Sequence, residues 1–105
     1  MNKKCSIGFN KAGKIEIAVK PGVIGKNPVE LELFTDDIVI ERNAAEGVTR
    51  TYNFSSKTVV SVFNDKTTSV TSFGNNELYS GLIENIVISN REAIAALKTQ
   101  LPQAK

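Results

Sequence analysis

The feature of this sequence that most constrains its fold is an alternation of apolar and polar residues with a period of two. Ile15, Ile17 and Val19 alternate with charged or small residues, so a strand here would place all three apolar side chains on one face. Other segments show the same period, or the β-branched and aromatic composition that strands favour. The predicted strands lie in residues 14–20, 29–34, 38–40, 48–54, 59–63, 67–73 and 82–88.

Turn-forming residues separate the predicted strands. Residues 10–13, Asn-Lys-Ala-Gly, have the composition of a hairpin turn. Clusters of Gly, Pro, Asn, Asp and Ser interrupt the chain again at residues 21–28, 36–37, 43–47, 55–57, 64–66 and 74–76. Ser80 and Gly81 suggest a bulge or break in the last β segment. The chain therefore predicts a mainly β fold, an antiparallel β-sandwich or small barrel of seven to eight short strands.

A single C-terminal α-helix is predicted at about residues 89–101, where it would close the sandwich or barrel. Ser89 and Glu92 have the spacing of a capping box, in which the serine is the N-cap and the glutamate follows three residues later. The apolar residues after them recur at helical spacing, which predicts a helix packed against the core. These residues are Ile94, Leu97 and Leu101.

Length and composition predict one small soluble domain that occupies residues 1–105. A chain of 105 residues, 41% of them apolar, can bury one core and hardly two. Residues 1–4 resemble the basic start of a signal peptide, but no apolar segment follows them. The only cysteine, Cys5, cannot form an internal disulfide and suits a reducing compartment. The sequence therefore predicts a cytoplasmic protein.

The absence of histidine removes most catalytic and metal-binding chemistry from consideration. Without it the chain has no Ser-His-Asp or Cys-His catalytic group and no histidine-containing zinc site, so we expect no enzyme activity, no metal and no cofactor. Asp36, Asp37 and Glu41 are the alternative, as a calcium or acid–base site, although adjacent aspartates before a strand are more typical of a turn. Cys5 lies next to Lys4 and could be reactive, but a buried, inert thiol is the favoured interpretation.

Charges are sorted along the chain, although the net charge is only +2. Residues 1–27 hold six lysines and one glutamate, whereas residues 28–47 hold six acids and one arginine. Lys4, Lys11 and Lys14 would meet around the first hairpin, where they could bind a phosphate or an anionic membrane.

A second interpretation of this charge pattern is that the sheet neutralises itself. If residues 14–20 pair antiparallel with residues 29–34, the lysines share a solvent-facing surface with Glu16, Glu30 and Glu32. Cross-strand ion pairs would then cancel much of the apparent sorting, and this is the interpretation that we favour.

The order of the segments resembles bacterial pleckstrin-homology-like or GRAM-like domains over residues 30–101, roughly two-thirds of the chain. Residues 31–40 look like a strand, a Thr-Asp-Asp turn and a second strand of that group. Residues 56–63 are similar to the strand that follows, and residues 86–93 look like the last strand and the opening of the helix. The tryptophan that many of these helices carry is missing. The resemblance implies a scaffold that binds lipid or protein rather than an enzyme, with the first-hairpin lysines loosely matching a phosphoinositide-binding motif.

Together these features predict a small non-catalytic protein-interaction module, such as an accessory subunit, an inhibitor or an immunity-type protein. Its partner would be another protein that binds by surface complementarity. The alternative is a module that binds anionic lipid or phosphate through the lysines of the first hairpin. Nucleic acid is disfavoured as a partner, because only Phe9 lies among these lysines and single strands are usually held on several aromatic rings.

Overall fold

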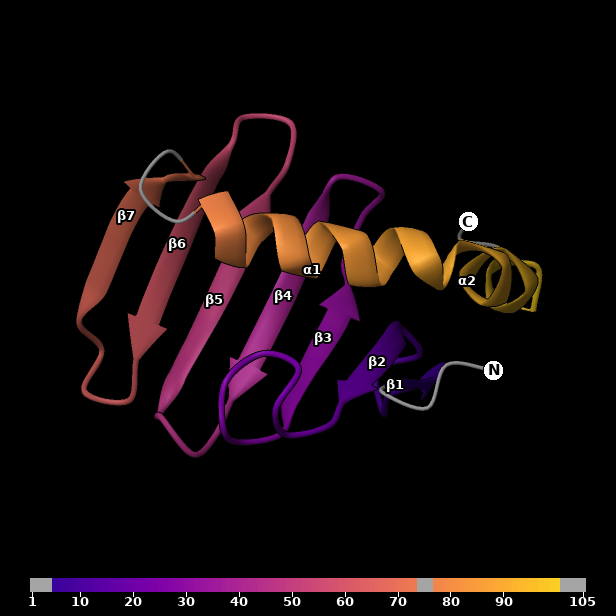
Figure 1. The fold of residues 1–105 in the computed structure, drawn as a ribbon, viewed down its shortest axis with the longest axis horizontal. Coiled ribbons are helices and arrows are strands. Elements are labelled where there is room, and N and C mark those ends of the chain that lie inside the picture. The colour runs from indigo at the N-terminus through magenta and orange to yellow at the C-terminus, as the bar shows by residue number, and fades with distance from the viewer. Residues whose placement is uncertain (1–4, 74–76, 101–105) are drawn as a thin grey trace.

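The computed structural model describes residues 5–73 and 77–100, which form seven β-strands followed by two α-helices. The strands follow one another in chain order, and each pairs antiparallel with the next. Figure 1 shows this order from β1 at one edge of the sheet to β7 at the other. The predicted mainly β class and number of strands are therefore confirmed. The strands are β1 (Cys5–Phe9), β2 (Ile15–Val19), β3 (Val29–Leu33), β4 (Ile38–Asn43), β5 (Val48–Asn53), β6 (Thr58–Phe63) and β7 (Thr68–Ser72).

Polar side chains at the ends of the strands explain why the chain turns where it does. Between β1 and β2, the side-chain oxygen of Asn10 accepts hydrogen bonds from the backbone N–H groups of Ala12 and Lys14, at 2.9 and 3.0 Å. A short side chain that bonds to the backbone in this way favours a turn over continuation of the strand. The residues that accept similarly in later turns are Thr35, Asn43, Asn53 and Asp65.

Gly47 allows two of these turns to pack against each other. Its φ of 67° lies in the left-handed region, and an added Cβ would lie 2.7 Å from Nδ2 of Asn64. The backbone N–H of Asn64 also donates to the carbonyl of Gly47, at 2.9 Å. The β4–β5 turn therefore contacts the β6–β7 turn directly, at a point where the left-handed backbone conformation and the nearby Asn64 side chain favour glycine.

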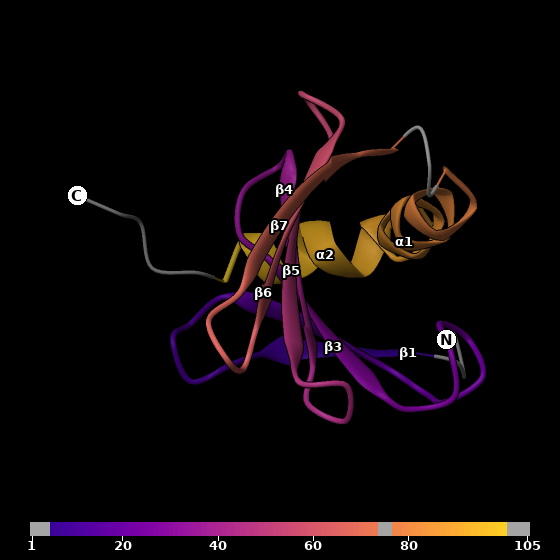
Figure 2. The ribbon, with the colours of Figure 1, turned by 90° about the vertical axis from the view of Figure 1, so that its left-hand side faces the viewer.

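The core lies on one face of the twisted sheet, which we call the inner face. Helix α1 (Glu77–Ser89) crosses this face in front of β5, β4 and β3 (Figure 1), and the loop between β2 and β3 lies on the same side (Figure 2). That loop contributes Ile24, which is 3% exposed. The buried apolar residues that meet here include Ile15, Ile17, Val19, Val29, Leu31, Leu33, Val39, Ile83 and Ile86.

Residues 82–88 were predicted to be a strand, and the structure shows that this prediction is wrong, because they lie within α1. The buried residues Ser80, Ile83 and Ile86 are spaced by three, which is a helical period that the β-branched composition obscured. The bulge suggested at Gly81 is likewise helical. Only an element that lies across the sheet can cover its inner face, so packing overrides the local preference for strand.

A second helix, α2 (Arg91–Lys98), lies inside the predicted range 89–101 but does not begin with the predicted capping box. Ser89 is the last residue of α1, and its hydroxyl donates to the carbonyl of Ile86 at 3.1 Å. The N-cap of α2 is Asn90, whose side chain makes no capping bond and instead donates to the same carbonyl at 2.6 Å. Both polar side chains therefore hydrogen-bond to a carbonyl in the last turn of α1. Neither caps the start of α2, so the capping-box prediction is wrong.

The apolar stripe predicted for the C-terminal helix does pack against the core. Ile94 is 5% exposed, and Leu97 is partly buried against the core. Leu101, the third member of the predicted stripe, lies outside the described residues. Helix α2 packs against β1 and β2, at the opposite edge of the sheet from β7.

The sheet remains open instead of closing into a barrel or pairing with a second sheet. Its seven strands run from β1 to β7 in a single layer, and two helices replace the single closing helix that we predicted. Within residues 5–73 and 77–100, no helix is long and apolar enough to cross a membrane. The open sheet leaves two edge strands, β1 and β7.

We expect Ile94→Ala to lower the free energy of unfolding by about 2–4 kcal/mol, because it removes a buried side chain from the helix–sheet interface. Ile88→Ala is the matched control, since Ile88 is 50% exposed and its loss should change stability by less than about 0.5 kcal/mol. Urea unfolding followed by circular dichroism would measure both. Equal effects of the two substitutions would contradict the packing of α2.

Candidate functional site

The lysines predicted to bind an anionic ligand do not form an isolated basic patch. Lys4 lies outside the described residues. Lys11 is exposed in the turn between β1 and β2, and Nζ of Lys14 lies 5.0 Å from the centre of the Phe34 ring. A cation over an aromatic ring is a favourable contact, so Lys14 already interacts within its own sheet.

Glutamates gather next to these lysines on the outer face of β2 and β3, opposite the inner face. Glu16 is the direct cross-strand neighbour of Glu32, and Glu30 lies diagonally opposite Glu16. Arg42 of β4 forms an ion pair with Glu32, with 2.6 Å between Nη2 and Oε1. The predicted pairing of the two strands is therefore confirmed. The expected pairing of lysine with glutamate is not, because within the described residues Glu32 pairs with Arg42.

Burial and the carboxyl groups that gather on the outer face raise the pKa of Glu16. Partial burial and the nearby charge of Glu30 raise the pKa of the Glu16 carboxyl above its ordinary value, and a hydrogen bond between the two carboxyls acts in the same direction. Arg42 has the opposite effect on this pKa. Like charges held side by side disfavour the ionised form, so the raised pKa shows that carboxyl groups, and not free cations, dominate the surroundings of Glu16.

Lys11 shares a shallow depression with these acids. The depression has a volume of about 590 Å³ and is lined by Phe9, Asn10, Lys11, Ala12, Glu16, Glu30, Glu32 and Arg42. Three carboxylates therefore face two cations, Lys11 and Arg42. An anionic ligand that entered the depression would meet carboxyl groups beside both cations, which disfavours the anionic-ligand interpretation of this hairpin.

We expect the wild-type protein to show no salt-sensitive binding to vesicles of anionic phospholipid, and Lys11→Glu/Lys14→Glu to leave this result unchanged. Cosedimentation with vesicles at about 50 and about 150 mM salt would measure it, because screening weakens true electrostatic binding across this range. The control reverses two lysines in distant turns, Lys57→Glu/Lys66→Glu. Salt-sensitive binding that only the first variant abolished would contradict the expectation.

Asp36, Asp37 and Glu41 do not form a shared site. The two aspartates lie in the turn before β4, where the hydrogen bond and charge of Lys98 hold the pKa of Asp36 below its ordinary value. The side chain of Glu41 is fully buried on the inner face. Within residues 5–73 and 77–100, no group of three histidine, cysteine or acidic residues is arranged to hold a metal. The thiol of Cys5 is buried at 6% exposure.

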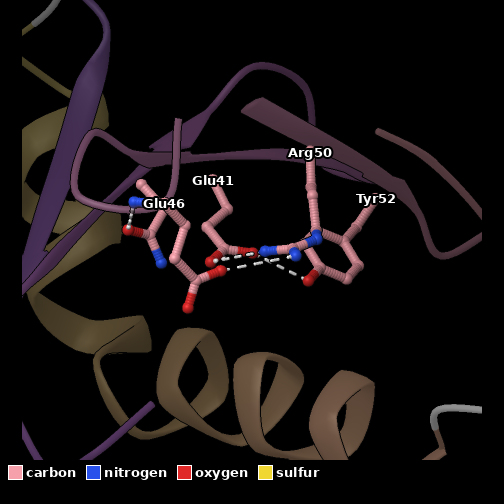
Figure 3. A network of polar contacts seen from close by, with 5 residues as sticks. Glu41, Glu46, Arg50 and Tyr52 are labelled. Atoms are coloured by element: carbon pink, nitrogen blue, oxygen red, sulfur yellow. Dashed lines mark hydrogen bonds and ion pairs between the residues drawn. The ribbon is translucent and has the colours of Figure 1, made fainter. Parts of the chain in front are cut away.

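Glu41 belongs instead to a polar network between the sheet and α1. Figure 3 shows its side chain extending toward the helix together with Arg50 and Tyr52 of β5. The Tyr52 hydroxyl donates to Oε1 of Glu41 at 2.8 Å, and Nη1 of Arg50 lies 3.4 Å from Oε2. Arg50 also reaches Glu46 in the β4–β5 turn, at 3.7 Å. Both carboxylate oxygens of Glu41 therefore have donors within the fold, and its side chain is fully buried. This arrangement is typical of a structural polar network and leaves Glu41 closed to a substrate.

Tyr52 also belongs to an aromatic cluster that packs against the residue following β7. The centres of the Tyr52 and Phe54 rings lie 6.2 Å apart, and the centre of the Phe73 ring lies 6.0 Å from that of Tyr52 and 5.4 Å from that of Phe54. These spacings are typical of favourable aromatic pairs. Phe73 directly follows β7, so the cluster fixes where that strand ends.

We expect Tyr52→Phe to lower the free energy of unfolding by about 1–3 kcal/mol, because it removes a buried hydrogen-bond donor from Glu41 and leaves the ring in place. In a Glu41→Leu background the same substitution should cost clearly less, because its carboxylate partner is gone. Chemical unfolding of the four proteins would complete this cycle. An equal cost in both backgrounds would show that the hydrogen bond does not couple the two residues.

Strand β7 is a candidate interaction element that the sequence alone does not reveal. All five of its residues are exposed, and Val70 is 65% exposed. No charged residue occurs in β7 or in its neighbour β6. The signal was present in the sequence as an uncharged Thr-Ser-Val-Thr-Ser segment, but only the strand order reveals that this segment lies at the edge of the sheet.

The hydrogen bonds of the β6–β7 hairpin reveal which backbone groups of β7 face outward. The N–H groups of Phe63 and Phe73 donate to the carbonyls of Thr67 and Lys57, at 2.9 and 3.0 Å. Odd-numbered residues from 67 to 73 therefore direct their backbone groups toward β6, because these directions alternate along a strand. The residues whose N–H and C=O groups face away from the sheet are Thr68, Val70 and Ser72.

Comparison with protein-family models, curated proteins and solved structures finds no match to this chain.

Proposed function

We propose that this protein is a small non-catalytic protein-interaction module whose docking element is the edge strand β7. The observation that carries the proposal is that β7 combines complete exposure with a row of outward-facing backbone groups and no charge. A partner strand could add to this edge by hydrogen bonding to the backbone, which is a recurring mode of protein recognition. An accessory subunit, inhibitor or immunity-type protein in the cytoplasm could act in this way.

The two edges of the sheet support the choice of β7. Proteins commonly protect an edge strand with charges, proline, a bulge or a covering element. Strand β1 has a buried residue, Cys5, and α2 packs against it. Strand β7 has no proline and no charge, pairs in regular register with β6 and is exposed throughout. An unprotected edge of this kind favours pairing with another chain.

Binding of an anionic lipid or phosphate through Lys11 and Lys14 is a less well supported alternative. The acidic depression beside Lys11 and the contact of Lys14 with Phe34 both count against it. The proposal agrees with the binding-scaffold role implied by the resemblance to pleckstrin-homology-like domains. That resemblance assigns residues 86–93 to a last strand and the opening of a helix, but residues 86–89 lie in α1, so the proposal does not depend on membership of that group.

We expect the tagged protein to capture a polypeptide from an extract of its native host, and Val70→Pro to abolish the capture. Proline removes only an N–H that faces away from β6, and proline is tolerated at such edge positions. The matched control is Val70→Thr, which keeps the N–H and the β-branched shape. Mass spectrometry would identify the captured chain.

The melting temperatures of both variants should remain close to that of the wild type, which would show that the β6–β7 pairing is intact. Capture that survives Val70→Pro would contradict docking at β7 and move the interaction to another surface. The same conclusion would follow if Val70→Thr lost capture as completely as Val70→Pro.

A further inference from the structure

The sequence of β7 is nearly symmetric about its central residue. Thr-Ser-Val-Thr-Ser has a valine at the centre and hydroxyl residues on both sides. When this strand is placed antiparallel to a copy of itself, Val70 faces Val70, Thr68 faces Ser72, and Ser69 faces Thr71. Every position therefore meets a residue of its own kind.

The backbone of β7 has the same symmetry. The outward-facing residues are Thr68, Val70 and Ser72, which are evenly spaced around Val70. In an antiparallel pair, alternate opposed residues exchange two N–H···O=C bonds. A two-fold axis at Val70 makes all three outward residues members of such pairs, so each outward N–H and C=O group finds a partner in the copy.

The β6–β7 pair already shows the same side-chain matching within one chain. Val60 is opposite Val70, and Ser61 is opposite Ser69. Such pairs of β-branched and hydroxyl side chains stabilise antiparallel sheets. A second β7 would continue the row of valines on the outer face and the row of hydroxyls on the inner face.

The absence of charge at this edge favours a second copy over a partner of opposite charge, and the small area indicates a weak contact. The protein carries a net charge of +2, but neither β6 nor β7 has a charged residue, so two copies can meet here without like charges in contact. A ladder of five residues buries less than about 1,200 Å², the lower limit of stable interfaces. The contact would therefore be reversible and weak.

We infer that the occupant of the β7 edge is β7 of a second copy of this chain, in a two-fold dimer whose axis passes at Val70. This inference rests on the proposed function, because it names the partner of the same edge. The interface is isologous, so it closes on itself at two chains, and the two sheets become one continuous sheet.

Sedimentation equilibrium of the purified full chain should reveal a reversible dimer with a dissociation constant on the order of 100 µM. Val70→Lys should weaken it at least about tenfold, because two lysines would face each other at the axis. The matched control is Val62→Lys, which adds the same charge on the same outer face, at a residue that is 41% exposed on the neighbouring strand. The control should retain the dimer.

Charge swapping keeps the test informative even if a variant is perturbed. A mixture of Val70→Lys and Val70→Asp proteins should associate more tightly than either variant alone, because opposite charges then face each other at the axis. For the wild type, the dissociation constant should change by less than about twofold between about 50 and about 500 mM salt, since no charge lies in the ladder.

A wild-type protein that remains monomeric at about 1 mM, ten times the expected dissociation constant, would overturn the inference. So would a dimer that persists in Val70→Lys, or a Lys and Asp mixture that does not associate. These failures are separable from failure of the proposed function. If the purified chain is monomeric but Val70→Pro still abolishes capture of a different protein, the edge binds a foreign strand. If both results are negative, neither the dimer nor docking at β7 stands.

Discussion

The structure depends on covering the apolar inner face of a single open sheet. Residues such as Ile17 and Leu31 are at most 1% exposed, yet they belong to strands that have no second sheet above them. Full burial of such a side chain contributes about 1.5–3 kcal/mol relative to exposure. Helix α1 and the loop between β2 and β3 lie over this face (Figure 2), so the buried core is shared between the sheet and the C-terminal segment.

The parts of the fold that follow from local patterns could be predicted from the sequence. Alternation at Ile15, Ile17 and Val19 and the turn at Asn10 have local physical causes, and both agree with the structure. Helix α1 could not be predicted in this way, because its composition favours a strand and only the uncovered sheet makes it a helix. The candidate site could not be predicted from local patterns either. To predict the acidic surroundings of Lys11 one must know the register of three strands, and to predict the exposure of β7 one must know the order of all seven.

The length of α1 determines which strands it can cover. A helix of 13 residues is about 20 Å long, which is about four strands wide at a spacing of ~4.8 Å. Helix α2 then packs on β1 and β2. The two helices therefore lie over the strands from β1 to β5, and β7 lies at the end of the sheet that they do not cover (Figure 1). An exposed edge at β7 follows from the same geometry that buries the core.

The composition of the strands allows the far end of the sheet to remain uncovered. Ser61 of β6 and Ser69 and Thr71 of β7 lie on the inner face but carry hydroxyls, so water can contact them without the penalty of exposed apolar surface. The backbone groups of the β7 edge are hydrated in the same way. Exchanging water for a partner strand gains only about 0.5–1.5 kcal/mol per hydrogen bond, whereas association costs at least about 4 kcal/mol in lost freedom of motion. Six such bonds across the two-fold axis contribute about 3–9 kcal/mol, which is of the same order as this cost, and the cross-strand side-chain pairs add to them. The balance suits reversible pairing and is too small for a permanent complex.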